Sequence, residues 1–220
     1  MNIRIDEKMK ETYPMIRLGC IEYDVKVELE NGSLWNYIHE ECIPKLMEQF
    51  ETIGLTNIEG IQSSRNAYKA FGRNPSRYRV SSESLLRRIR QGHELYHVNT
   101  VVDTNNLISI QTACSVGSYD AKHIQGDVVL SVGKAGEGYK GIGKDYIDME
   151  NMILLKDDLG AFGSPTSDSH RAMIEMDTKH VITLIYCFSD QLDLNSELNR
   201  ASEYLKKYVK AENIETCIIK

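Results

Sequence analysis

Residues 98–110 read VNTVVDTNNLISI, and their spacing predicts the helix around which the fold is organised. Apolar side chains fall on one helical face, which we expect to be buried: Val98, Val101, Val102 and Ile108. A second face is polar, since three side chains recur at i, i+4 and i+7: Asn99, Asp103 and Asn106. The segment therefore predicts a helix that packs on a core with one side and presents amide and carboxyl groups with the other.

Strands are predicted on both sides of this helix. Downstream, residues 128–132 and 181–186 are rich in β-branched side chains and are flanked by turn residues, as strands are. Upstream, apolar and charged residues alternate over 25–30 and stop at the turn pair Asn31-Gly32, which predicts a half-buried strand. The apolar end of the chain, residues 217–219, is expected to add an edge strand.

Two further helices are predicted from apolar stripes. Between 33 and 54 an apolar residue recurs at every fourth position: Leu34, Ile38, Cys42, Leu46 and Phe50. Pro44 is expected to kink this helix. A second stripe lies near the end of the chain: Leu194, Leu198, Ala201, Leu205 and Tyr208. Because strands bracket helices, the sequence predicts an α+β fold of mixed sheets with packed helices.

The composition is that of an ordinary globular protein. The 220 residues are 41% hydrophobic and 26% charged and show no boundary, so we expect one domain over 1–220. The five cysteines are odd in number and at least twenty residues apart, which favours reduced thiols. The histidines lack paired metal-ligand spacing, so neither a metal nor another cofactor is expected. A charged start and the lack of a run of roughly 20 apolar residues favour a cytoplasmic protein without a membrane span.

Positive charge is concentrated in residues 65–90. This segment has eight cations and one anion, so its net charge is +7 and the rest of the chain carries -13. Aromatic residues lie between the cations, a combination that suits a single-stranded RNA end, whose phosphates attract cations and whose bases stack on rings. The RNA-binding candidates are Arg73, Arg77, Tyr78, Arg79, Arg87 and Arg88. The alternative is that the rings belong to the core (Tyr68, Phe71 and Tyr78) and that the arginines form a solvated face.

The end of this basic segment predicts a short helix. Ser81 or Ser82 is a suitable N-cap, and Glu83 would lie near the positive end of the helix dipole. Gly92 is expected to end the helix. The cations of the helix would then lie beside those of the preceding loop.

Two loops are rich in glycine or in hydroxyl side chains, at 136–141 and 163–171. Residues 136–141 read GEGYKG and match GxGxxG, but no convincing amphipathic helix follows, so we interpret these glycines as turn residues. Residues 163–171 read GSPTSDSHR and form the densest cluster of hydroxyl groups. Such a loop can hold a small polar ligand or position a water molecule. The alternative is a turn that is satisfied by its own Ser and Asp side chains.

The run GHELYHVNTVVDTNNL over 92–107 carries a family resemblance. Tyr119-Asp120, Gly126-Asp127 and Gly136-Glu137 follow in the same order, with 68–83 upstream. The run and these pairs resemble the B3/B4 editing module of the beta subunit of bacterial phenylalanyl-tRNA synthetase. The upstream stretch 68–83 and the loop SPTSDS over 164–169 resemble the stand-alone relatives of this module. The resemblance covers 65–188, onto which 1–64 and 193–210 are expected to pack. It implies an α+β fold, tRNA as a partner, and a pocket that hydrolyses the ester of a wrongly attached amino acid, without the synthetase's ligase domain.

The resemblance also implies which residues line the pocket. The catalytic candidates are Asp168, Thr166 and Glu137, with Asp168 holding the substrate ammonium or orienting water. The substrate-binding candidates are Asn99, Asp103, Asn106, Asp120, Ser164 and Ser167. Asp103 and Asp120 are equally suited to be structural caps.

Two positions depart from the family pattern. Gly117 matches a family His, and Leu184 matches a family Glu. Their lack of polarity favours a second hypothesis, a non-catalytic protein that binds aminoacyl-tRNA or a free amino acid. A third is an unrelated small-molecule enzyme on the same scaffold.

Overall fold

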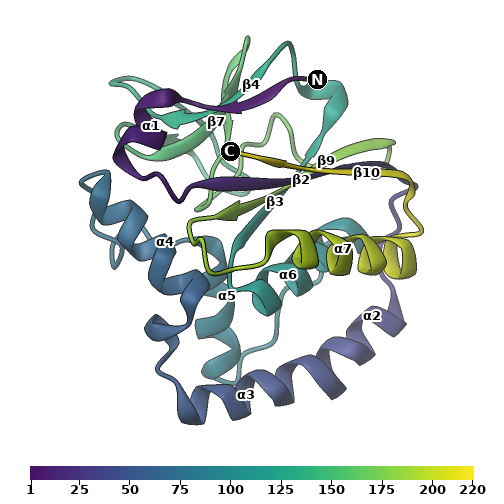
Figure 1. Ribbon diagram of the computed structural model, residues 1–220. Coiled ribbons are helices and arrows are strands. Elements are labelled where there is room, and N and C mark those ends of the chain that lie inside the picture. Colours follow the sequence, from purple (N-terminus) through teal and green to yellow (C-terminus); the bar gives the residue numbers. More distant parts are fainter.

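The computed structural model describes residues 1–220, which form two four-stranded sheets covered by helices (Figure 1). The first sheet is mixed, because β1 runs parallel to β4 while the other pairs are antiparallel. Its strands, in spatial order, are β1 (Ile3–Ile5), β4 (Val128–Val132), β7 (Ile153–Asp157) and β8 (Gly160–Gly163). The second sheet is antiparallel throughout, with the order β10 (Glu212–Ile219), β2 (Arg17–Asp24), β9 (His180–Cys187) and β3 (Ser115–Asp120). The predicted α+β class with mixed sheets is confirmed.

The helices lie mainly on one side of the antiparallel sheet (Figure 1). They are α1 (Glu7–Thr12), α2 (Gly32–Tyr37), α3 (Ile43–Thr52), α4 (Glu59–Ala70), α5 (Ser81–Arg90), α6 (Thr100–Thr112) and α7 (Leu194–Tyr204). Helices α6 and α7 pack directly under this sheet, and the arm formed by α2 and α3 lies beyond them. Strands β5 (Gly138–Lys140) and β6 (Tyr146–Asp148) form a separate small hairpin between β4 and β7. None of the helices combines the length and the apolar character that a membrane span requires.

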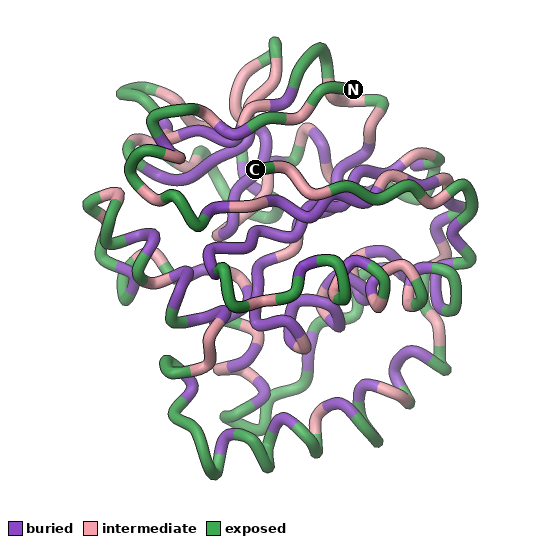
Figure 2. Tube along the Cα trace, viewed as in Figure 1, coloured by how far each residue is buried: buried purple, intermediate pink, exposed green.

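Strand β9 separates two apolar layers. Its side chains alternate, as the two-residue period of a strand requires. Ile182, Leu184 and Tyr186 enter the core between the two sheets, whereas Val181 and Ile185 enter the core shared with α6 and α7. Figure 2 shows this burial as continuous through the sheet and along the inward faces of the helices.

Several sequence predictions are confirmed. Strands β4 and β9 occupy 128–132 and 180–187, and the apolar end of the chain is the edge strand β10. The apolar stripes predicted over 33–54 and 194–208 are buried. The GEGYKG segment runs into strand β5 and opens no helix, so its glycines are not those of a dinucleotide-binding loop.

The predicted strand over 25–30 is wrong. Strand β2 lies earlier, and its pairing with β9 ends at Asp24 opposite His180. Beyond that point the backbone of Glu28 bonds to the start of α6, accepting from the Thr100 amide at 2.9 Å and donating to the Thr100 hydroxyl at 3.2 Å. Alternation of Val25 and Val27 with charged residues therefore reflects an extended segment that packs against a helix.

Two helix details also differ from prediction. Pro44 produces no break, because a π turn over Ile38–Cys42 precedes α3 and places the proline in its first turn. There its missing N–H has no helical partner to lose. In α5 the N-cap is Val80, without a side-chain hydrogen bond, rather than Ser81 or Ser82.

Candidate functional site

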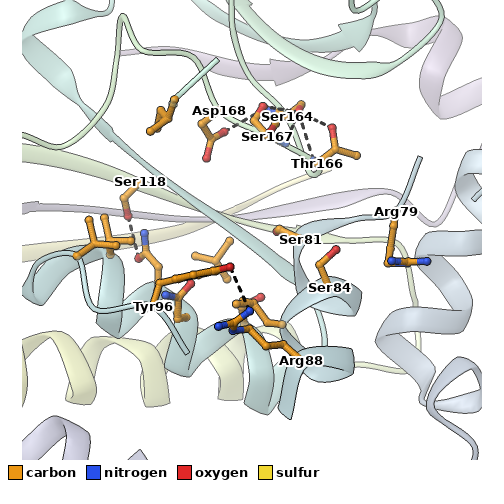
Figure 3. A pocket seen from close by; sticks show the side chains of 18 of the residues that line it. Arg79, Ser81, Ser84, Arg88, Tyr96, Ser118, Ser164, Thr166, Ser167 and Asp168 are labelled. Atoms are coloured by element: carbon orange, nitrogen blue, oxygen red, sulfur yellow. Dashed lines mark hydrogen bonds between the residues drawn. The ribbon is translucent and has the colours of Figure 1, made fainter. Parts of the chain in front are cut away.

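A cavity of about 690 Å³ lies at the open edge of the antiparallel sheet. Strand β3 forms this edge, and α5 and α6 pack against it from one side. The loop that follows β8 approaches from the other side (Figure 3). The segment 91–98, between α5 and α6, lines the mouth. The cavity is therefore enclosed by segments that are far apart in the chain.

Asp168 supplies the only carboxylate in the cavity wall. Its Oδ1 accepts both of its hydrogen bonds, from the Tyr119 hydroxyl at 2.8 Å and from the Ser164 amide at 3.2 Å. Oδ2 has no partner in the protein and is open to the cavity. Burial raises the pKa of Asp168 to about 6, although the two hydrogen bonds act in the opposite direction. At neutral pH the side chain is ionised, with one oxygen fixed and one free.

The hydroxyl-rich loop is both a satisfied turn and part of the cavity wall. The Ser164 hydroxyl donates to the Ser167 carbonyl at 2.7 Å and accepts from the amides of Thr166 and Ser167 at 3.2 and 3.0 Å. The self-satisfied turn considered as an alternative is thus present, and Ser164, Thr166 and Ser167 still line the cavity. Because these amides are already bonded, they are not free to stabilise an oxyanion.

A chain of hydroxyl groups orients an amide in the cavity floor. Tyr23 contacts Thr183 at 3.2 Å, Thr183 contacts Ser118, and Ser118 donates to Asn105 Oδ1 at 2.9 Å. This leaves the Asn105 Nδ2 group to face the cavity. Sequence reasoning missed Asn105 and Ser118. The signal for Asn105 is the series 98, 102, 105 and 109, which repeats at helical spacing one residue before the predicted polar series 99, 103 and 106.

Three arginines converge on a buried carboxylate at the opposite wall. Glu83 is fully buried, and its oxygens lie 3.0 Å from Arg65, 2.8 Å from Arg87 and 3.6 Å from Arg79. Arg79 and Arg87 line the cavity together with Arg88. Glu83 thus holds two of the arginines that line the cavity, Arg79 and Arg87. Because three arginines share one carboxylate, the cluster keeps an excess of positive charge.

Two predicted pocket residues of α6 lie outside the cavity. The Asn99 side chain caps the helix by accepting from the Val102 amide at 3.0 Å. Asp103 is fully buried and accepts from Trp35 Nε1 at 3.1 Å and from the Val98 amide at 2.9 Å. Burial raises its pKa despite these bonds. Both side chains therefore stabilise the start of the helix. The face of α6 that lines the cavity is rotated from the predicted one, and of the predicted face only Asn106 lines the cavity.

Asp120 and Glu137 are also structural. Asp120 caps the turn after β3 through the Lys122 amide at 3.0 Å and accepts from the Thr178 hydroxyl at 2.8 Å. Glu137 accepts from the Lys134 amide at 2.7 Å and closes the turn that leads into β5. Neither lines the cavity, so the predicted placement of both in the pocket is corrected.

The basic segment divides between two places. Arg79, Arg87 and Arg88 line the cavity, but Arg73, Arg77 and Tyr78 do not. Arg73 donates to the carbonyls of Glu150 and Asn151, and its guanidinium lies 4.9 Å from the Tyr78 ring centre. All three rings of the segment pack in or against the core: Tyr68 is buried, and Phe71 and Tyr78 are partly buried against it. For these rings the core alternative holds.

Gly117 and Leu184 also lie outside the cavity. They are directly paired between β3 and β9, and Leu184 is in the core between the sheets. A Cβ atom on Gly117 would lie 2.2 Å from the Tyr119 hydroxyl oxygen, so the Tyr119 ring occupies the space of any side chain there. The same ring closes off Gly163 at 2.4 Å. The glycine at 117, where the family has a histidine, thus leaves room for the Tyr119 ring, whose hydroxyl holds Asp168.

No group of three His, Cys, Asp or Glu side chains is arranged to hold a metal ion.

Comparisons with known proteins identify one family. A family model described as the B3/4 domain matches residues 63–219. Among solved structures, the chain is similar to the crystal structure of an N-terminal fragment of the phenylalanyl-tRNA synthetase beta-subunit from Pyrococcus horikoshii, with 14% sequence identity and a TM-score of 0.48. The match covers 99% of this chain and 50% of that fragment, so the chain spans half of its length. None of the curated proteins matches the chain.

Proposed function

The chain belongs to the B3/4 domain family, and on that premise we propose that it binds the acceptor end of tRNA and hydrolyses the ester of a wrongly attached amino acid. The resemblance of its sequence to a tRNA-editing module supports the choice of substrate. We propose further that residues 1–220 act as one domain, since β1 and β2, which precede the matched region, pair with strands inside it: β1 with β4, and β2 with β9 and β10.

One observation carries the proposal: the cavity has walls of opposite charge. Asp168 presents a partnerless carboxylate oxygen on one side, and Arg79, Arg87 and Arg88 present cations on the other. An aminoacyl-tRNA end has the matching pattern, with an α-ammonium group next to the ester and phosphates on the RNA. Carboxylates pair with ammonium groups, and arginines recognise phosphates.

The remaining cavity groups suit ester hydrolysis. Water attacks the ester carbonyl, and Asp168 Oδ2 accepts the proton of the water. In the alternative role Asp168 holds the ammonium group that places the ester, and the proton of the water passes to the departing 3′-terminal oxygen of the RNA. The tetrahedral oxyanion accepts a hydrogen bond from Asn105 Nδ2, which the Ser118 hydroxyl orients. Cleavage of the ester C–O bond then returns the proton to the 3′-terminal oxygen of the RNA, and the amino acid leaves.

A second candidate is a binding protein without catalysis. The bonded amides of the hydroxyl-rich loop, which are not free to stabilise an oxyanion, favour this candidate. Asp168 would then hold the ammonium group only.

The decisive test is ester loss from a panel of tRNAs charged with different amino acids. We expect at least one of them to lose its ester faster with the protein than in buffer alone. Background rates for every tRNA would contradict the hydrolase. If charged tRNA still bound the protein more tightly than uncharged tRNA, that result would establish the second candidate.

Replacing Arg87 and Arg88 with Ala is expected to weaken tRNA binding and to flatten its dependence on salt. Each phosphate contact to a single strand contributes about 0.7 to the slope of log affinity against log salt, so losing two should reduce the slope by about 1.4. Binding titrations at several salt concentrations measure this slope. The matched control replaces Lys206 and Lys207, adjacent exposed cations away from the cavity. An unchanged slope in the arginine variant would rule out phosphate contact.

A further inference from the structure

Tyr96 is a large aromatic side chain at the cavity mouth that the proposed hydrolysis does not use. It is 63% exposed and lines the cavity. The Arg88 guanidinium covers one side of its ring at 4.1 Å from the ring centre and donates to its hydroxyl at 3.1 Å (Figure 3). Arg88 also donates to the Glu94 carbonyl. One face of the ring is therefore covered, and the exposed remainder faces solvent and the cavity.

The backbone that carries Tyr96 is anchored on both sides. Leu95 is buried in the core of the helices, and the His97 ring stacks on Trp35 at 3.6 Å with an angle of 7° between the planes. The Val98 amide donates to the buried Asp103 carboxylate. These contacts hold the segment in place although it has no regular secondary structure. The backbone of Tyr96 is thus anchored and Arg88 supports the ring, so less conformational entropy would be lost when a ligand packs on it than at a free loop.

The surroundings of Tyr96 select the chemistry of the ligand. Val98 and Ile142, which are 51% and 49% exposed, also line the cavity, so the mouth offers apolar surface. Gln91 provides an amide that can both donate to and accept from a planar polar edge. Arginines supply positive charge in the same wall. A flat aromatic group with a polar edge and a nearby phosphate fits this combination, and a nucleobase has all of these features.

We propose that Tyr96, backed by Arg88, is the stacking platform for the unpaired terminal base of the bound RNA. The inference rests on the proposed function, because it assigns the base of the same RNA end whose acyl group reaches Asp168. The base lies on the open face of Tyr96, the phosphates point toward Arg79 and Arg87, and the ester enters the cavity. Tyr96 is a specificity-determining residue: it discriminates an intact 3′ end from a shortened one.

The test compares a tRNA that has its complete 3′ end with the same tRNA lacking the terminal adenosine. The wild-type protein is expected to bind the intact tRNA about 5- to 150-fold more tightly, the effect of one stacked base. Tyr96→Ala should remove this preference, and Tyr96→Phe should keep most of it because the ring remains. Tyr146→Ala is the matched control: Tyr146 is also 63% exposed but does not line the cavity. Urea unfolding of each variant verifies that the fold is intact.

The outcomes separate the platform from the proposed function. If Tyr96→Ala keeps the preference, or if the wild type binds both tRNAs equally, the platform is refuted while RNA binding stands. If the wild type binds neither tRNA, the proposed function fails and the platform fails with it. Titration with 5′-AMP distinguishes a free nucleotide: Tyr96-dependent binding of 5′-AMP without any binding of tRNA would overturn RNA as the occupant.

Discussion

Replacing Asp168 with Asn is expected to slow ester hydrolysis by a factor of about 10² to 10⁴, the usual contribution of a positioned acid or base. The two side chains have the same shape, and Oδ1, which accepts both hydrogen bonds, is retained. Only Oδ2 changes, from a carboxylate oxygen to an NH₂ group that can neither accept a proton nor pair with an ammonium group. Single-turnover deacylation of a charged tRNA that the wild type hydrolyses measures the effect.

The loss should not come from unfolding. Burial disfavours the ionised form of Asp168, so its charge opposes folding at pH 7, and the neutral Asn should leave the free energy of unfolding unchanged or higher. Asp145→Asn serves as the control, because Asp145 is exposed and does not line the cavity. Equal rates for Asp168→Asn and the wild type would remove Asp168 from the chemistry.

The same reaction should depend on pH through Asp168. Its pKa of about 6 is raised, so the carboxylate that both proposed roles require is lost as pH falls through 6. Below that value we expect the rate over background to fall about tenfold per pH unit. The stability effect has the opposite sign: the folded protein holds this proton more tightly than the unfolded chain, so the contribution of Asp168 to stability decreases as pH rises toward and through 6. Asp168→Asn should remove this stability effect. An N-acetylated aminoacyl ester that is cleaved equally fast would assign Asp168 to water rather than to the ammonium group.

Replacing Glu83 with Ala is expected to lower the free energy of unfolding by roughly 3 to 5 kcal/mol, the range for removing one partner of a buried ion pair. Glu83 is fully buried, and the Arg65 side chain is only 19% exposed, so its cation would lose its carboxylate and keep only the Ser76 hydroxyl as a partner. Arg79 and Arg87 are 41% and 35% exposed and can turn to water, which places the loss toward the lower end. Urea unfolding should show a lower midpoint with an unchanged slope.

The control for this change is Glu48→Ala in α3, because Glu48 is exposed and forms no ion pair. Its effect should lie within about 0.5 kcal/mol, as for ordinary surface substitutions. A loss of similar size for Glu83→Ala would mean that the three arginines do not depend on this carboxylate. In that case their placement at the cavity would need another explanation.

Local patterns predicted most of the elements. The β-branched runs at β4 and β9 and the apolar stripes of α3 and α7 were readable because each depends on spacing within one segment. The stripe expected around α6 is wrong at Val98, which precedes the helix and is exposed at the cavity. The strand predicted over 25–30 failed because alternation reports which side of a segment is buried, and it does not report what pairs with the backbone. The backbone there bonds to α6, which lies about 70 residues later.

The site was only partly predictable, for the same reason. Asp168, Thr166 and the serines of their loop were found because hydroxyl and carboxyl groups are dense there. Asn105 was missed because Asn99 and Asp103 looked equally polar, and their use as caps for α6 emerges only from contacts with Trp35 and the helix backbone. Glu83 carried a readable signal, with Arg79 and Arg87 four residues on either side. Its third partner, Arg65, could not be predicted from spacing, because it reaches Glu83 only through the packing of α4 beside α5.

The Tyr119 ring constrains three positions at once: Gly117, Gly163 and Asp168. A histidine at 117 and a tyrosine at 119 exclude each other on this backbone, since the ring already fills the volume beside Gly117 and Gly163. Gly117→His alone should therefore be deleterious, because the new side chain would displace the hydroxyl that holds Asp168. Exchange between this arrangement and one with a histidine requires concerted substitutions. Epistasis of this kind predicts that engineering a histidine here succeeds only in a background where position 119 is already small.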